Sequence, residues 1–220
     1  MEKVEIPSSI AYYLNGIFSG CNRLESLTVN KRNPYYYSPE NSNAIIETDS
    51  KRLVQGCNYT IIPDDVQIIG ISAFEMFDKI ESVNLPQSVY SIEQDAFHAC
   101  VNLKSVNLHK DIKSIGETAF EGCTSLTDVY CYADDPPQIS ETSFPSCVTV
   151  HVTKESALKY YADPIWSLFN IVDDLTDSVE QHGFSQDKNG HLHYYDIMGR
   201  QSDLLHNKLR ITKGKKYIYF

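Results

Sequence analysis

The chain lacks an excess of positive charge, a long apolar run and a Cys-x-x-Cys pair. Its 220 residues include 19 Lys and Arg against 29 Asp and Glu, a formal net charge of −10. Because no basic stripe is present to displace counterions, nucleic acid is not an expected partner. No stretch of 18 apolar residues occurs, so no membrane span is predicted. The negative charge favours solubility and does not indicate a fold.

Motifs for catalysis and metal binding are also missing. There is no glycine-rich phosphate loop, HExxH or GxSxG segment. Carboxylates that are adjacent in the chain do not usually face each other across a substrate, so we expect these pairs on solvated loops: Asp64–Asp65, Asp134–Asp135 and Asp173–Asp174. His191 and His193 share one face of a predicted strand, but no third ligand is near them in sequence. We therefore expect no catalytic residue, no cofactor and no metal ion.

What the sequence does have is a repeat of 23 or 24 residues, set by four phenylalanines. Ala precedes three of them, and Ile and Val recur at the same interval. A fixed period in the twenties predicts a solenoid, in which each unit buries its apolar face against its neighbours. The repeated positions are Phe74, Phe97, Phe120 and Phe144; Ala73, Ala96 and Ala119; Ile69, Ile92 and Ile115; and Val83, Val106 and Val129.

Each unit is predicted to contain two short strands joined by a turn. Alternation over residues 103–108 favours a half-buried strand, and residues 89–92 favour a shorter one. The segment 95–100 between them is too short for a stable α-helix and fits a single helical or 3₁₀ turn. Gly70 and Gly116 stand just before this turn, where we expect a tight bend that favours a residue without Cβ.

Four of the six cysteines fall at one repeat position, and we expect them to form a ladder of buried thiols that pack in the core. The spacing of metal-binding cysteines is absent. Cys57 and Cys131 lie outside the ladder. The four ladder positions are Cys21, Cys100, Cys123 and Cys147.

The predicted solenoid occupies residues 1–174. An irregular insert covers about residues 30–61, where two apolar runs around a polar turn predict a hairpin. Its Tyr35, Tyr36 and Tyr37 form either a contact patch or a set of rings packed alternately at the edge of a coil. Residues 134–174 form a cap, with a short helix over 154–161 and Trp166 over the last coil. Residues 175–185 are a predicted linker, and 186–220 a small β module.

The units resemble BspA-like leucine-rich repeats, which are common in surface proteins of Bacteroidetes. The pattern Ile-Pro-x-x-Val-x-x-Ile-x-x-x-Ala-Phe-x-x-Cys-x-x-Leu-x-x-Val-x-Leu is carried by residues 85–108, with near-copies over residues 4–173. The first unit departs from it at Tyr13 and Ile17. The resemblance implies an α/β, β-dominated solenoid of short parallel strands and one-turn helices. It also implies a non-enzymatic role in adhesion or protein interaction.

The C-terminal segment shows a second resemblance, which is independent of the repeats. It is similar to the sorting segments of proteins exported across the Bacteroidetes outer membrane. The similar residues are 195–200 and Gly214-Lys215-Lys216, although residues 208–211 depart from the usual Gly-Ile-Tyr-Ile strand. This resemblance implies secretion and display at the cell surface. No signal peptide follows Met1, so we expect an export signal to have been removed.

Alternation identifies one candidate binding face, on the longer strands. With Val83, Val106 and Val129 inward, small polar residues point outward, and tyrosines join them in the fourth unit. The alternative is that Ser and Asn only solvate the sheet or bond across strands. The outward rows are Ser26, Ser82, Ser105 and Asp128; Thr28, Asn84, Asn107 and Tyr130; and Asn30, Pro86, His109 and Tyr132. The candidate partner-binding residues are Thr28, Asn84, Asn107, Asp128, Tyr130 and Tyr132.

Three functions are compatible with these patterns. The favoured one is a secreted or cell-surface repeat protein that binds a protein partner, such as host extracellular matrix or another bacterial surface protein. The second is a structural spacer or stalk without a specific ligand. The third, a carbohydrate-active enzyme, has no acid–base or nucleophile constellation to support it.

Overall fold

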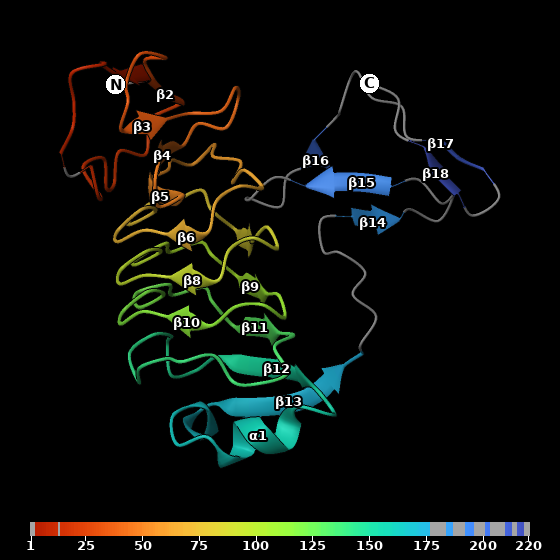
Figure 1. Ribbon diagram of the computed structural model, residues 1–220. Helices are drawn as coiled ribbons and strands as arrows, with labels where there is room; N and C mark the ends of the chain where they lie inside the picture. The colour runs from red at the N-terminus through yellow and green to blue at the C-terminus, as the bar shows by residue number, and fades with distance from the viewer. Residues whose placement is uncertain are drawn as a thin grey trace.

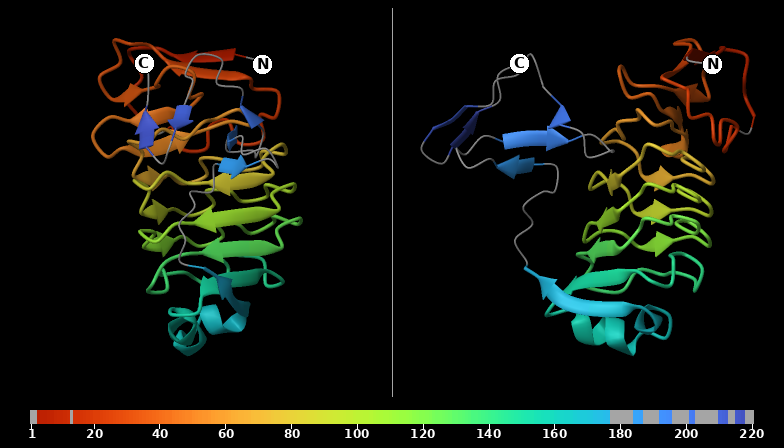
Figure 2. Two further views of the ribbon diagram at one scale, coloured as in Figure 1. Left: turned by 90° about the vertical axis from the view of Figure 1, so that its right-hand side faces the viewer. Right: turned by 180° about the vertical axis from the view of Figure 1, so that it is seen from behind.

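The computed structural model describes residues 3–12 and 14–176, together with five short strands in the C-terminal part. Residues 3–176 wind into a stack of coils that runs from the N-terminal strands to helix α1 (Figure 1). The predicted solenoid of stacked parallel strands is confirmed. Its strands line two sides of the coils, which two further views show as separate columns (Figure 2).

One side is the long-strand sheet, in the order β13-β12-β11-β9-β7, with every pair parallel. Neighbouring strands pair at equivalent repeat positions, so Val83, Val106 and Val129 stack inside. The strands are β7 Ser82–Asn84, β9 Ser105–Leu108, β11 Asp128–Cys131, β12 Thr149–Thr153 and β13 Asn170–Leu175.

The other side is the short-strand sheet, in the order β10-β8-β6-β5-β4-β3. Its inward residues Ile69, Ile92 and Ile115 are buried. The parallel strands are β5 Arg52–Gln55, β6 Ile68–Ile69, β8 Ser91–Ile92 and β10 Ser114–Ile115. At the N-terminal end β1 Lys3–Ile6 and β2 Ser26–Val29 form a separate parallel pair.

The predicted phenylalanine ladder forms the centre of the core. Centroids of successive rings from Phe74 to Phe144 lie 4.9, 5.2 and 5.0 Å apart, and each pair is within 2° of parallel. Phe18 of the first unit is only partly buried. The stack therefore links four coils directly, and each inner ring depends on both of its neighbours.

The segments between the strands are tight turns rather than the expected one-turn helices. Asp95 and Ala99 have φ of 57° and 55°, in the left-handed region, and a helix cannot continue through them. The turns also stack, since Phe97 N–H donates to Ala119 O at 2.8 Å and Phe120 N–H to Ser143 O at 2.9 Å. Each coil thus satisfies backbone groups of the next.

Gly116 is needed for a different reason from the predicted bend. Its φ is not in the left-handed region, but a Cβ at this position would lie 2.4 Å from the backbone nitrogen of Gln94. At Gly70 a Cβ would lie 2.8 Å from Leu53 O. Glycine is required here because the backbones of adjacent coils approach closely.

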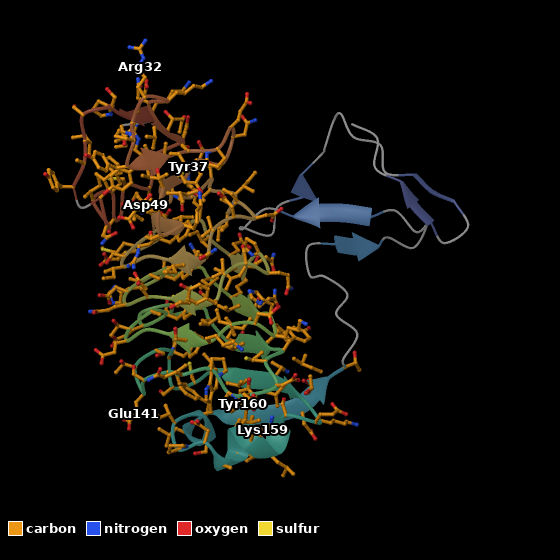
Figure 3. All side chains as sticks on the ribbon, viewed as in Figure 1. Arg32, Tyr37, Asp49, Glu141, Lys159 and Tyr160 are labelled. Atoms are coloured by element: carbon orange, nitrogen blue, oxygen red, sulfur yellow. The ribbon has the colours of Figure 1, made fainter. Side chains whose placement is uncertain are left out.

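The insert forms the predicted hairpin and adds a third strand. β4 Ile45–Glu47 pairs antiparallel with β5, and β3 Tyr36–Tyr37 pairs antiparallel with β4. Tyr36 is buried whereas Tyr35 is 53% exposed, so the tyrosines alternate as the packing alternative expects. The hydroxyl of Tyr37, labelled in Figure 3, donates to Asp65.

The C-terminal cap closes the last coil. α1 Ala157–Ala162 overlaps the helix predicted over 154–161 but begins three residues later and ends one residue later, and η1 Trp166–Leu168 follows it. The indole N–H of Trp166 donates to Pro137 O at 2.7 Å, and the ring centroid lies 5.9 Å from that of Phe144. Lys159, labelled in Figure 3, pairs with Asp135 at 2.6 Å. The prediction that Asp173–Asp174 lies on a loop is wrong, because both residues belong to β13.

The predicted cysteine ladder is correct only in its middle. The thiols of Cys100 and Cys123 are buried and donate to Phe74 O and Phe97 O, each at 3.1 Å. Cys21 and Cys147 are exposed instead. Cys147 follows Pro145, which has no N–H to repeat the 3.1 Å bond from Glu121 to Thr118 O in the preceding coil. Cys21 lies in the first described coil, with no described coil above it to cover the thiol.

Beyond β13, two strand groups are described by their backbone pairing. β14 Phe184–Gln186, β15 Leu192–Tyr195 and β16 Gln201–Ser202 are antiparallel, and β17 Arg210–Thr212 pairs with β18 Lys215–Tyr217. Most of the predicted linker, much of the sorting-like motif and His191 lie outside the described residues. The division of this part into a linker over 175–185 and a β module over 186–220 stays a prediction.

Candidate functional site

The long-strand sheet arranges five of the six candidate residues on one face. Asn84 pairs in register with Asn107, and Asn107 with Tyr130. The amide of Asn107 donates to the carbonyl of Asn84 at 2.8 Å, so the asparagines form a cross-strand ladder. Asp128 lies two residues before Tyr130, and Tyr132 two residues after it, which places all three on the same side.

Four of the expected outward positions do not join this face: Ser26, Thr28, Asn30 and His109. Thr28 lies on β2, which pairs only with β1 and is not part of the long-strand sheet. His109 is only 8% exposed, and its Nδ1 accepts a hydrogen bond from Asp111 N–H at 3.2 Å. Burial lowers the pKa of His109 below 6.5, although Asp111 opposes this shift.

The C-terminal end of the face is aromatic and acidic. His151 on β12 pairs in register with Tyr130, and the two rings stack with centroids 4.7 Å apart at 20°. Nδ1 of His151 lies 2.9 Å from Oδ1 of Asp174, and Nε2 lies 3.1 Å from Oδ1 of Asp128. One imidazole thus bridges carboxylates from β11 and β13.

The environment of His151 favours its charged form. Burial opposes the imidazolium, because the side chain is 14% exposed, but hydrogen bonds and charges from Asp174 and Asp128 outweigh it. The pKa of His151 is therefore raised above 6.5. With both ring nitrogens bound to carboxylates, the imidazole has no free position to activate a nucleophile.

The neighbouring groups keep their ordinary charge states at neutral pH. Burial, followed by the charge of Asp128, raises the pKa of Tyr130, and burial followed by Tyr130 raises that of Tyr132. Hydrogen bonds from Thr127 and then His151 lower the pKa of Asp128, against the effect of burial. The surface offers neutral phenols beside two carboxylates, which suits contact and hydrogen bonding.

Sequence reasoning missed His151 and Asp174. A usable signal existed for His151, because residues 148–152 alternate apolar and polar, and Val150 pairs with the inward Val129. Continuing the alternation would have placed His151 beside Tyr130. No comparable signal existed for Asp174, because the pairing of β12 with β13 shifts its register between His151 and Thr153.

The described part of the chain holds neither a candidate metal site nor a membrane-spanning helix. Its His, Cys, Asp and Glu residues form no group of three or more that would hold a metal ion. No described helix is both long enough and apolar enough to cross a membrane.

Comparisons with known proteins agree with this geometry. The family model of the BspA type leucine-rich repeat region matches residues 1–47 and 52–166, in six copies. No similar protein was found among curated proteins.

Two solved structures share the fold. A leucine-rich cell surface protein from Faecalibacterium prausnitzii has a TM-score of 0.58 and 21% identity over 81% of this chain. A leucine-rich repeat protein from Eubacterium ventriosum has a TM-score of 0.56 and 20% identity over 69% of this chain. The matches cover 49% and 42% of those proteins, so this chain spans about half of their length or less. With its repeats matched over most of its length, the chain belongs to the BspA type leucine-rich repeat family.

Proposed function

We propose that the chain is a non-catalytic, secreted repeat protein of a bacterial cell surface, and that its long-strand sheet binds a protein partner. The observation that carries the proposal is the change along the outward row of this sheet. The row passes from Asn84 and Asn107 to the stacked rings of Tyr130 and His151. Residues that merely solvated a sheet would not need this change.

The chemistry of this end favours a protein as partner. Tyr130 and Tyr132 combine a broad ring with a hydroxyl and are only partly exposed, as residues at interface centres are. Asp128 and Asp174 lie beside them, and Asp174 is 51% exposed. A partner that presents basic side chains would complement both the carboxylates and the net charge of −10. Host extracellular matrix proteins and other bacterial surface proteins are the expected classes.

Surface display belongs to the same proposal. The structural relative from Faecalibacterium prausnitzii is described as a cell surface protein. The resemblance of residues 195–216 to sorting segments supports export in a Bacteroidetes cell. A spacer role is the second candidate, favoured by the small, hydrogen-bonded Asn84–Asn107 part of the face.

Binding to purified extracellular matrix proteins tests the proposal. We expect Tyr130→Ala/Tyr132→Ala to weaken binding by about 30-fold, as truncation of central aromatic residues does. The matched control, Asn84→Ala, changes the strand at the far edge of the same sheet and should retain most of the affinity. If wild type and both variants bind equally, the partner binds elsewhere on the chain, and if none of them binds, the spacer role is favoured instead. Melting temperatures of all three proteins must first show that they are folded.

A further inference from the structure

A pocket of about 380 Å³ lies on the short-strand side of the solenoid, away from the candidate protein-binding face. The segment around Tyr12 and Asn15 forms one wall, and strands β3, β4 and β5 form the other. Its volume falls within the range of small-ligand sites, roughly 300–1,000 Å³. The pocket thus has the size of a small-ligand site and is separate from the candidate protein-binding face.

Three neighbouring strands present its polar side chains. Tyr36 on β3 pairs in register with Glu47 on β4, and Arg52 begins β5 after the turn that follows Glu47. Ile46 and Leu53 pair across the same strands and are buried in the core. Alternation therefore directs Glu47 and Arg52 outward, where both line the pocket. Because these groups stand on paired strands, their positions are fixed by the sheet.

Asn33 holds the two walls together. Its amide donates to Pro7 O at 2.9 Å and to Ile10 O at 3.0 Å, on the chain that leads to Tyr12. Its side-chain carbonyl accepts from the N–H groups of Tyr35 and Tyr36 at 2.9 and 3.0 Å. Asn33 is only 8% exposed, so this bridge is internal. It gives the loop wall a defined position relative to the strand wall.

Two polar groups of the pocket have hydrogen-bonding capacity that no described residue uses. Tyr36 is 5% exposed, and no described residue makes a hydrogen bond with its phenol. Burial and then the charge of Glu47 raise the pKa of Tyr36, so the phenol remains a donor at neutral pH. Ser50 donates to Oε2 of Glu47, which leaves Oε1 as an acceptor. Both groups line the pocket, where they are available to a hydrogen-bonding ligand.

The charged side chains of the pocket and the exposed Tyr12 at its rim limit the chemical class of ligand that the pocket can bind. Arg52 is paired with Glu93, so its charge is already balanced, and Glu47 makes the lining unfavourable for an anion. Tyr12 at the rim is 80% exposed and offers a ring face to an apolar surface. A ligand that combines apolar C–H faces with hydroxyls able to donate and accept meets all of these conditions. We propose that this pocket binds a neutral sugar residue of a glycan.

A second hollow suggests the direction in which a longer glycan would run. A shallow groove of about 510 Å³ follows β8 and β10 and is lined by Ser91, Ser114 and Gln94. Glu93, the partner of Arg52, also lines this groove, so the ion pair connects the two hollows. We therefore expect neutral oligosaccharides to bind more tightly than the corresponding monosaccharides.

Saturation-transfer NMR with the full chain tests the inference. The probes are glucose, galactose, mannose and N-acetylglucosamine with their oligomers, and glucuronic acid and free amino acids serve as comparisons. We expect at least one neutral series to bind, and Tyr36→Phe, which removes only the hydroxyl, to weaken it roughly tenfold. Tyr12→Ala should act in the same direction. Tyr35→Ala, an exposed tyrosine of the same insert outside the pocket, should change the affinity by less than about twofold.

Several outcomes would overturn the inference. They are the absence of binding by every neutral sugar, preferential binding of amino acids or glucuronic acid, and binding that is unaffected by both pocket substitutions. Tyr130→Ala/Tyr132→Ala should leave sugar binding unchanged, so failure of this inference and failure of the protein-binding proposal are separate results. Melting temperatures equal to that of wild type must accompany each variant.

Discussion

Nδ1 of His151 lies 2.9 Å from Oδ1 of Asp174, and this contact joins the side chains of two successive strands, β12 and β13. The other ring nitrogen contacts Asp128 on β11 at 3.1 Å. A single imidazole therefore connects the last three strands of the long-strand sheet. Helix α1 of the cap follows β12 in the chain, so this bridge also supports the closed end of the solenoid.

The stability contributed by His151 should depend on pH. Its pKa is raised above 6.5 in the folded chain, so protonation favours folding. The contribution is fully present below pH 6.5 and is lost as the pH rises through the folded pKa. We expect His151→Gln to cost about 1 kcal/mol at pH 5.5, since Asp174 is half exposed and solvent screens the pair. At pH 8.5 the cost should be smaller.

Thermal melting of wild type and His151→Gln at the two pH values measures this difference. The loss at pH 5.5 corresponds to a lowering of the melting temperature by about 2–4 °C. Asp174→Asn provides the matched control, because it removes one carboxylate and should reduce the same pH dependence. A larger loss at pH 8.5 than at pH 5.5 would contradict the assigned charge state.

His109 should show the opposite pH dependence. Burial lowers its pKa below 6.5, so the folded chain favours the neutral imidazole. The stability linked to His109 is present above pH 6.5 and is lost as the pH falls through the folded pKa. His109→Gln should therefore flatten the decline of the melting temperature between pH 6.5 and pH 5. If the substitution steepens this decline, the histidine is charged in the folded chain.

The repeat made most of the fold predictable. Each coil buries the same positions against its neighbours, so spacing alone located Phe97, Val106 and Ile92 in the core. The turns were less predictable, because Asp95 and Ala99 adopt the left-handed backbone conformation although neither residue is glycine. Gly116 was correctly singled out for the wrong reason, since the close approach of Gln94 depends on how two coils pack.

Features at the ends of the repeat were hardest to predict. Cys21 and Cys147 occupy the same repeat position as Cys100, but burial at this position requires a neighbouring coil and a regular turn. The candidate site is also irregular at its C-terminal end. Asp174 lies beside His151 only because the pairing of β12 with β13 shifts its register. The sugar pocket depends on a loop that folds back over the insert, and no periodic pattern describes such a contact.

Phe97→Ala should unfold the solenoid cooperatively. Its ring lies between those of Phe74 and Phe120, at 4.9 and 5.2 Å, and its removal leaves a cavity in the middle of the stack. Such changes cost ~3–5 kcal/mol, a large share of the ~5–15 kcal/mol typical of a domain. Phe18→Ala, at a partly buried ring outside the stack, should cost less. A melting temperature for Phe97→Ala within about two degrees of wild type would be incompatible with this packing.

Thiol labelling should distinguish the two classes of cysteine. Cys21 and Cys147 are exposed, whereas Cys57, Cys100, Cys123 and Cys131 are buried. Burial raises the pKa of Cys131 to about 11 and that of Cys100 well above 9.0, so these thiols stay protonated and are poor nucleophiles in the folded chain. We expect two of the six cysteines to react in the folded chain and all six after denaturation. Cys21→Ser/Cys147→Ser should abolish the native reaction without lowering the melting temperature appreciably. Four or fewer reactive thiols in denaturant without reductant would instead show a disulfide, and Cys100 and Cys123, whose thiols interact on adjacent coils, would be its expected partners.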